Sequence, residues 1–203
     1  MWLPCSPGLR GAGAVVQIHR DGSVTLLTGA CDIGQGSNTV LAQIAAEELG
    51  VGFEDIRITS ADTELTPLDG GTFGSGVTLR AGKAVRAAAA SAKRKLFAAV
   101  APKLEVKEDD LEARDHRIFV RGNPEKGLTF REALKIHQYN DAPMPIVGRG
   151  YYLPPVKEPT TLLTESGDMS PAYSFGTQGI EVEVDRETGQ ISVKRVVTAH
   201  DSG

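Results

Sequence analysis

Two glycine-rich turns stand directly before stretches that are typical of amphipathic helices. The first is Gly34-Gln35-Gly36, and the second is Gly74-Ser75-Gly76-Val77-Thr78. The free N–H groups at a helix start favour anions, and glycine lets a ligand approach the backbone closely. Ser75 and Thr78 add hydroxyl donors, and the amide of Gln35 both donates and accepts. Together the two turns could grip one extended phosphorylated ligand, although either turn taken singly is more often only a helix cap.

Several known catalytic motifs fail on spacing. A nucleotide-hydrolase phosphate loop, G-x-x-x-x-G-K-[ST], would need glycine where Val77 stands and a hydroxyl where Ala84 stands. The dinucleotide fingerprint G-x-G-x-x-G is absent, and Phe73 breaks the G-x-S-x-G frame around Ser75. No carboxylate pair stands out, and Asp32, Asp62 and Asp69 are typical of turns or caps. We therefore name no catalytic residue in this chain.

A metal site built from the chain's own side chains is not expected. The four histidines are scattered without an i, i+4 pair, and Cys5 and Cys31 have no metal-ligand spacing. The two cysteines are most simply free thiols in a reducing compartment, which predicts a cytoplasmic location.

The charge balance restricts the class of partner. The 203 residues carry 22 Lys and Arg against 26 Asp and Glu, a net charge of −4. This balance argues against a general nucleic-acid or membrane-surface binder. No apolar run is long enough to cross a bilayer, and the N-terminal residues lack the pattern of a signal peptide.

The pattern around the turns predicts a hairpin, then two helices separated by a strand and a long loop. The hairpin turns at Asp21-Gly22. A helix over 37–49 is capped by Ser37 or Asn38, ends at Gly50, and buries one apolar face. A strand over 55–61 and a loop over 62–76 follow. The second helix runs from Thr78 to Val100 and ends before Pro102. The expected helix faces are Val40, Leu41, Ile44, Ala45 and Leu49, then Val85, Ala89, Ala92, Leu96 and Val100.

The rest of the chain predicts two further hairpins and one short helix. Residues 110–122 suggest a hairpin, and Thr129 with Glu132 forms a capping box for a helix ending near His137. Residues 139–171 are rich in proline and glycine and are expected to be mostly irregular. A final hairpin turns at Glu187-Thr188-Gly189. The order of elements predicts an α+β fold with helices layered on a mixed β-sheet.

Three separate blocks carry a resemblance to a known family. The blocks are "DIGQGSNTVLAQIAAEELG", "ADTELTPLDGGTFGSGVTLRAGKAV" and "PAYSFGTQGIEVEVDRETGQISVKRVVTAHDSG". In this order they resemble the molybdenum-cofactor-binding large subunit of the xanthine dehydrogenase and aldehyde oxidase family. Within that family they look most like 4-hydroxybenzoyl-CoA reductase-type subunits.

The resemblance implies a molybdenum-pyranopterin cofactor, as molybdopterin or its dinucleotide. It implies that Gly34-Gln35-Gly36 contacts the pterin and that Gly74, Ser75, Gly76, Val77 and Thr78 hold its phosphate. The metal would be held by the pterin's dithiolene, and iron–sulfur clusters and FAD would belong to partner subunits or domains. Neither nucleic acid nor a membrane is expected as a partner.

The chain departs from the family pattern in two ways. The second block often reads S-R-V-T in the family, and Gly76 replaces that arginine here. The family's catalytic glutamate would lie beyond His200–Gly203. We therefore expect residues 1–203 to be a single partial molybdopterin-binding domain, a fragment of a longer subunit that is inactive alone. The alternatives are a non-catalytic partner-binding or assembly domain that has lost the cofactor and, less favoured, a phosphate-binding module of unrelated ancestry.

Overall fold

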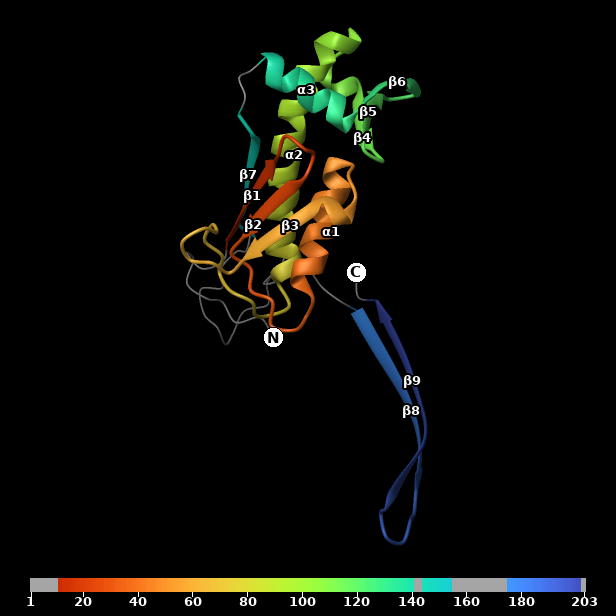
Figure 1. Cartoon of the computed structure of the whole chain (residues 1–203). Coiled ribbons are helices and arrows are strands. Elements are labelled where there is room, and N and C mark those ends of the chain that lie inside the picture. Colours follow the sequence, from red (N-terminus) through yellow and green to blue (C-terminus); the bar gives the residue numbers. More distant parts are fainter. Residues whose placement is uncertain (1–10, 141–143, 155–174, 202–203) are drawn as a thin grey trace. The chain divides into compact units, whose positions relative to one another are not determined.

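The computed structural model describes residues 11–140, 144–154 and 175–201 (Figure 1). The chain divides into two compact units, Met1–Pro154 and Pro155–Gly203. No helix among the described residues is long and apolar enough to span a membrane.

A four-stranded mixed sheet forms the centre of the first unit. Its strand order is β3-β2-β1-β7, where β1 is Ala12–Ile18, β2 is Val24–Thr28, β3 is Ile56–Ser60 and β7 is Ile146–Tyr152. The β1–β2 pairing is antiparallel and confirms the predicted first hairpin. β3 runs parallel to β2, and β7 pairs antiparallel with β1.

Helix α1 spans Ser37–Leu49, as predicted, and ends at Gly50 in the left-handed conformation. Its N-cap was predicted wrongly. Gly36 occupies the N-cap position, with φ of 77°, and no side chain of its own completes the cap. Leu41, Ala45 and Leu49 are buried as expected, whereas Val40 and Ile44 are only partly buried. The buried face is rotated toward Ala42 and Ala46.

Helix α2 spans Val77–Leu104 and is longer than predicted at both ends. All five residues of its expected apolar face are buried. Pro102 does not end the helix, because it lies within the last turn, where it costs only one hydrogen bond. The helix stops at Glu105, a left-handed residue whose N–H donates to the Pro102 carbonyl at 3.3 Å.

Backbone contact between α2 and β7 explains both the alanines of the helix and the glycines of the strand. A Cβ placed on Gly148 would lie 2.0 Å from the Ala88 carbonyl oxygen, and one on Gly150 would lie 2.1 Å from that of Ala84. The expected close packing of the alanine-rich helix is confirmed. The prediction of irregular structure over 146–152 is wrong, because β7 forms there.

A second layer covers the far end of α2. Its antiparallel sheet has the order β4-β5-β6, and helix α3 packs beside it (Figure 1). The predicted 110–122 hairpin is confirmed as β4 and β5, whereas β6 was not predicted. Thr129 and Glu132 form the predicted capping box, and α3 runs beyond His137 to Asn140. The bounds are β4 Leu111–Arg114, β5 Arg117–Val120, β6 Asn123–Thr129 and α3 Phe130–Asn140, with short 3₁₀ turns at Phe53–Asp55 and Glu108–Asp110.

The second unit contains the antiparallel pair β8 (Phe175–Val184) and β9 (Ile191–Asp201). It confirms the predicted final hairpin. Together with the three helices and the mixed sheet of the first unit, it confirms the α+β fold class. Whether both units form one domain stays a prediction. Cys5 and residues 155–174 lie outside the described residues.

Candidate functional site

The first glycine turn needs glycine for its backbone conformation. Gly34 has φ of 101° and Gly36 has φ of 77°, values that side-chain-bearing residues rarely adopt. Apart from the adjacent residues, no atom of the described part of the chain lies within 4 Å of the position that a Cβ would take on either residue. The turn therefore presents backbone to open space, where a ligand can approach.

Asp32 holds this turn from its N-terminal side. One carboxylate oxygen accepts the Gly34 N–H at 2.9 Å, and the other accepts the Asn38 N–H of the first turn of α1 at 3.2 Å. These backbone hydrogen bonds hold the pKa of Asp32 below its usual value. The capping role missing from Ser37 and Asn38 thus belongs to Asp32, which confirms Asp32 as a capping residue.

Gln35 closes the same turn with its side-chain amide. Its Oε1 accepts the Ile33 N–H at 2.7 Å, and its Nε2 donates to the Cys31 carbonyl at 3.2 Å. The side chain is exposed. An amide has a second N–H and a second lone pair, so Gln35 has the capacity to bind a ligand while it braces the turn.

The second glycine turn is a tight reversal with two consecutive positive φ angles. Gly74 has φ of 59° and Ser75 has φ of 53°, and the Gly76 N–H donates to the Phe73 carbonyl at 3.3 Å. A non-glycine residue in this region is strained, and such strain is concentrated at functional sites. The reversal places the exposed Ser75 directly before α2, with Thr78 exposed in its first turn.

The two turns are joined by a reciprocal pair of hydrogen bonds across 41 residues of sequence. The Thr72 hydroxyl donates to the Cys31 carbonyl at 2.6 Å, and the Cys31 N–H donates back to Thr72 Oγ1 at 3.2 Å. The same Cys31 carbonyl also accepts Gln35 Nε2. The structure therefore brings the predicted first and second site segments to one place.

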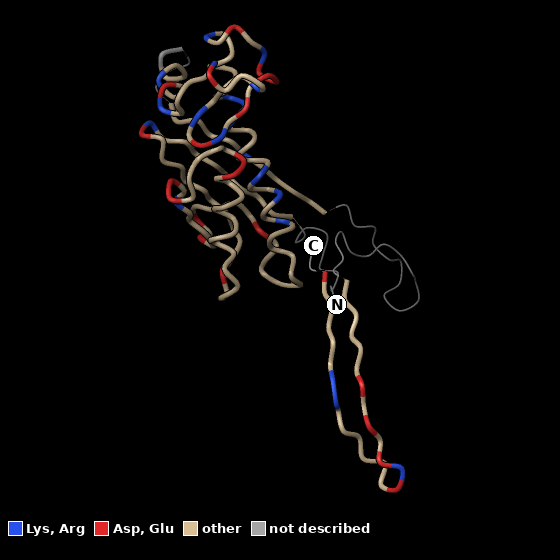
Figure 2. The backbone as a smooth tube through the Cα atoms, turned by 90° about the vertical axis from the view of Figure 1, so that its right-hand side faces the viewer, with Lys and Arg blue, Asp and Glu red and all other residues tan. Residues whose placement is uncertain are grey.

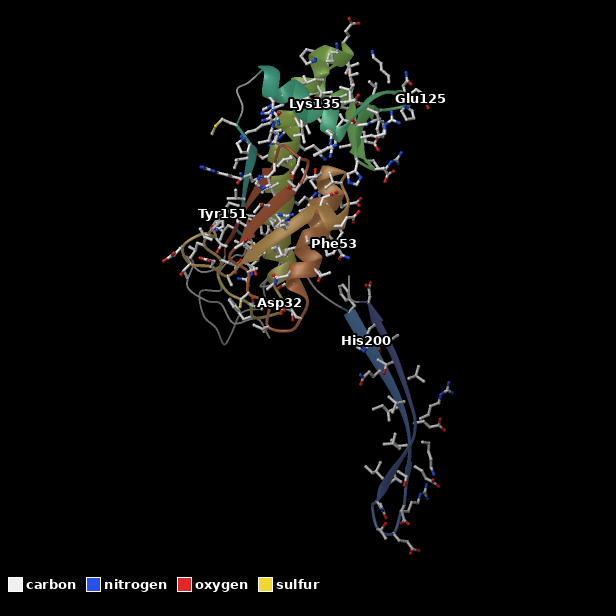
Figure 3. All side chains as sticks on the ribbon, in the orientation of Figure 1. Asp32, Phe53, Glu125, Lys135, Tyr151 and His200 are labelled. Carbon is white, nitrogen blue, oxygen red and sulfur yellow. The ribbon has the colours of Figure 1, made fainter. Side chains whose placement is uncertain are left out.

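The packing of α1 on α2 explains why both helix starts lie at one end of the unit. Ile44 of α1 faces Gly82 of α2, and further along Glu48 forms ion pairs with Arg86 at 3.1 Å and Lys93 at 2.6 Å. The helices therefore run in the same direction, and their N-termini share one end. Asp32 lies at that end in Figure 3, whereas Lys135 and Glu125 lie at the other.

The loop before the second turn is seated on β1 by main-chain hydrogen bonds. The Gly13 N–H donates to Leu68, and the Gly70 N–H donates to Gly11, both at 3.0 Å. Within the loop, Asp62 accepts the Glu64 N–H at 2.9 Å and Asp69 accepts the Gly71 N–H at 2.8 Å. Both aspartates are turn residues, as expected.

Unpartnered buried polar atoms lie at both helix starts. They include Oδ1 of Asn38 in α1 and Nη1 of Arg80 in the first turns of α2. Such atoms are rare in native structures and call for an explanation. An anionic and polar ligand held between the two turns would supply it.

A cavity of about 660 Å³ lies elsewhere in the first unit, between the turn of the first hairpin and α3 at the other end of the unit. Its polar lining mixes basic side chains with Asp21 and Gln138, and neither glycine turn contributes to it. Among the described residues no group of three or more His, Cys, Asp or Glu side chains could hold a metal ion. The two joined turns remain the candidate site.

The chain belongs to the molybdopterin cofactor-binding domain family, whose sequence model matches residues 2–203. The match covers nearly the whole chain and confirms the family expected from the three sequence blocks. It also excludes a module of unrelated ancestry.

Individual relatives agree with the family. The chain is 36% identical to the carbon monoxide dehydrogenase large chain of Afipia carboxidovorans over 94% of its own length and 22% of the relative's. It is 30% identical to the putative xanthine dehydrogenase molybdenum-binding subunit of Escherichia coli over 97% of its own length and 25% of the relative's. The chain therefore spans about a quarter or less of the relatives that it matches.

Solved structures show the same fold. The crystal structure of Cu,Mo-CO dehydrogenase matches 95% of this chain and 23% of that chain, with a TM-score of 0.72 and 35% identity. Quinoline 2-oxidoreductase from Pseudomonas putida 86 also matches 95% of this chain and 23% of that chain, with a TM-score of 0.72 and 28% identity. The chain thus shares its fold with about a quarter of each of these two chains.

Three residues of the candidate site were not found from the sequence as site residues. Asp32 was interpreted as a turn or capping residue without a role in the site, and Thr72 and Arg80 were given no role. Asp32 stands two residues before Gly34, a spacing common in turns whose Asp accepts the i+2 N–H. The contacts of Thr72 and Arg80 depend on the fold, and no local spacing marks them.

Proposed function

We propose that this chain is the cofactor-binding portion of a longer subunit of a molybdenum-dependent oxidoreductase. In this proposal Gly34-Gln35-Gly36 contacts the pyranopterin, with or without an attached nucleotide, and Gly74 to Thr78 holds its phosphate. The observation that carries the proposal is the Cys31–Thr72 hydrogen-bond pair, which places the two turns side by side.

The residues present fit such a group. The backbone of Gly34 and Gly36 faces open space, and a flat ring system can approach a glycine backbone without meeting a Cβ. Ser75 and Thr78 present exposed hydroxyls at the start of α2, where free N–H groups and the helix dipole favour an anion. Asp32 and Gln35 hold the first turn in shape before any ligand arrives.

When bound, the cofactor supplies a redox-active metal at which an oxygen atom and two electrons are exchanged with the substrate. The chain's own contribution is to bind and orient that group. Gln35 orients one edge of the pterin through its amide, and Ser75 and Thr78 donate hydrogen bonds to the phosphate. We assign no proton transfer to any residue of this chain.

Strands β8 and β9 carry apolar pairs that need a covering surface, for which we propose the remaining part of a large subunit. Three apolar cross-strand pairs, Ile180–Val196, Val182–Val193 and Val184–Ile191, lie directly opposite each other on β8 and β9. Each of these six side chains is between 47% and 63% exposed. A two-stranded hairpin with such apolar pairs is at best marginally stable in water, so a covering surface is required.

Electrons from the substrate would leave through partner subunits or domains that carry iron–sulfur clusters and FAD. The chain has only two cysteines, too few for clusters of its own. We also propose a cytoplasmic location, because Cys31 is a free thiol and free thiols are typical of a reducing compartment.

The test is the cofactor content of the full-length subunit that contains these residues. Gly34→Ala places a side chain where φ is 101° and the space in front is open, and Gly22→Ala does the same at φ of 94° in the first hairpin. The backbone strain is matched, but only Gly34 faces the proposed pterin. We expect molybdenum and pterin per polypeptide to fall in Gly34→Ala and to stay at the wild-type level in Gly22→Ala.

A non-catalytic assembly domain is the competing function. It is favoured by Gly76, which stands where the family pattern often has arginine. A wild-type subunit purified from its native host without molybdenum or pterin would establish that alternative. Equal cofactor content in wild type, Gly34→Ala and Gly22→Ala would show that the cofactor binds elsewhere.

A further inference from the structure

Arg80 is the most deeply buried charged side chain among the described residues, with 2% of its surface exposed. It lies one helical turn after Gly76, and its guanidinium folds back over the start of α2. Nη2 donates to the Gly71 carbonyl at 2.7 Å, and Nε donates to the Gly76 carbonyl at 3.3 Å. The guanidinium carbon lies 4.7 Å from the centroid of the Phe73 ring. One side chain thus contacts Gly71 and Phe73 in the loop before the second turn and Gly76 within the turn.

A side chain at position 76 would lie in tight contact with Arg80. A Cβ on Gly76 would lie 3.0 Å from Arg80 Nε and 3.6 Å from its guanidinium carbon. The two positions are therefore dependent on each other. Glycine at 76 admits the guanidinium, and the guanidinium brings to that spot the positive charge that residue 76 lacks.

Among the described residues, the two loops that form the candidate site carry no Lys or Arg apart from Arg80. Residues 29–36 and 61–79 contain four carboxylates and no Lys or Arg. In Figure 2 most Lys and Arg positions of the first unit lie toward α3 and the second sheet. Lys83, the next cation along α2, contacts Tyr152 of β7. Of the cations among the described residues, Arg80 therefore contacts the second turn most directly.

Arg80 forms no ion pair with any of the described residues. Asp69 interacts with it electrostatically but forms no ion pair with it, and Nη1 has no hydrogen-bond partner. Burial raises the pKa of Asp69, and the Gly71 N–H and the charge of Arg80 offset only part of that rise. A buried guanidinium with an unused donor is costly unless an anion completes it.

We propose that Arg80 prepares the second glycine turn for the phosphate group of the ligand: it clamps the turn through the carbonyls of Gly71 and Gly76 and supplies its positive charge. The ligand class rests on the proposed function, whereas the clamp rests on the contacts of Arg80 alone. Arg80 acts on the turn as a positioning residue, and its charge favours a phosphate ester over a neutral ligand.

The test uses the full-length subunit with four variants: Arg80→Leu, Arg80→Lys, the double variant Gly76→Arg/Arg80→Leu, and the control Arg86→Leu. Arg86 lies on the same helix, its side chain is 75% exposed, and its ion pair with Glu48 lies away from the turn. Arg86→Leu therefore matches the change of charge on α2 without touching the clamp.

The first measurement is amide hydrogen exchange of the peptide covering 71–76 in subunit produced without cofactor. Arg80→Leu should accelerate exchange of this peptide, Arg80→Lys should do so less, and Arg86→Leu should leave it unchanged. Equal exchange in wild type and Arg80→Leu would overturn the clamp, whatever the ligand is.

The second measurement is molybdenum and pterin per polypeptide in subunit produced with cofactor. Arg80→Leu should lower retention about tenfold, the loss expected for one charged hydrogen-bond donor. Gly76→Arg/Arg80→Leu should restore it, because the vacated space admits an arginine from position 76. Retention unchanged in Arg80→Leu would overturn the role of the charge. A wild-type subunit that holds no cofactor would refute the proposed function and the phosphate assignment, while the exchange measurement would still decide the clamp.

Discussion

Thr72 and Cys31 exchange two hydrogen bonds, at 2.6 and 3.2 Å, and so fasten the loop before α2 to the loop before α1. The Cys31 carbonyl that accepts from Thr72 also accepts from Gln35. A change at Thr72 should therefore alter the hydrogen bonds of the first turn, although Thr72 and Cys31 stand 41 positions apart.

Thr72→Val removes both bonds while keeping the shape of the side chain. We expect the free energy of unfolding of the first unit to fall by about 1–2 kcal/mol, the usual effect of losing hydrogen bonds of this kind. Cofactor content should fall as well. Thr66→Val is the control, because the Thr66 hydroxyl bonds only within its own loop, to the Asp62 carbonyl at 2.6 Å. Urea unfolding and molybdenum analysis check both variants, and equal cofactor loss in the two would contradict the linking role of Thr72.

Gly148→Ala should disrupt the first unit. The new methyl group would lie 2.0 Å from the Ala88 carbonyl oxygen and 2.5 Å from the Ala92 nitrogen, both backbone atoms of α2. Overpacking of this kind typically costs about 1–3 kcal/mol, and a clash with helix backbone belongs at the upper end. Gly179→Ala in β8 meets no atom within 4 Å and is the control. A wild-type melting temperature for Gly148→Ala would show that α2 does not touch β7 there.

Leu41→Ala and Ile44→Ala should differ in their effect on stability. Leu41 is fully buried in the hydrophobic core, so its truncation should cost about 2–4 kcal/mol. Ile44 is only partly buried, although the sequence pattern places both on the apolar face. Ile44→Ala should therefore lower the free energy of unfolding by less than Leu41→Ala does. Likewise, Ile44→Asp should lower it by less than Leu41→Asp does. Denaturant midpoints test the order, and a larger loss at Ile44 would contradict the observed rotation of the helix face.

Asp32 and Asp69 should give opposite pH dependences of stability. Backbone hydrogen bonds lower the pKa of Asp32 from 3.8, so its stabilisation is present above pH 3.8 and is lost as the pH falls through the lowered value. Burial raises the pKa of Asp69 from 3.8, so its relative stabilisation is present below pH 3.8 and is lost as the pH rises through the raised value.

The corresponding variants separate these two effects. Relative to wild type, Asp32→Asn should be most destabilising at neutral pH and less so in acid. Asp69→Asn should become relatively more favourable as the pH rises. Unfolding measured between pH 2.5 and pH 7 (about the range over which carboxylates titrate) checks both signs. The same pH trend in the two variants would contradict the burial-driven shift at Asp69.

Local patterns predicted what depends on neighbours in sequence. The hairpin at Asp21-Gly22, the stop at Gly50 and the capping box of Thr129 and Glu132 were all predictable because turn and cap chemistry acts over a few residues. The many alanines of α2 likewise predicted that this helix packs closely against a neighbouring surface. The strand β7 was missed because Gly148 and Gly150 are poor strand formers on their own. Both glycines let the backbone of α2 approach β7 closely, and this contact cannot be seen in the sequence.

Contacts between distant segments could not be predicted from the sequence. The N-cap residue of helix α1, Gly36, has no side chain that could cap the helix. Asp32, which lies outside the helix, accepts the Asn38 N–H instead. Arg80 looked like an ordinary helix cation, yet it fills the space beside Gly76. The roles of the eight residues from Gly34 to Gly36 and from Gly74 to Thr78 in binding a cofactor stay a prediction.

The most direct test of one ligand held by both turns is amide hydrogen exchange of the full-length subunit with and without its cofactor. If one ligand contacts both turns, the peptides covering 31–38 and 71–80 should both be protected when the cofactor is present. The tip of the β8–β9 hairpin, residues 185–190, should exchange equally in both states. Protection of only one of the two turns, or of neither, would contradict the binding of one ligand by both turns.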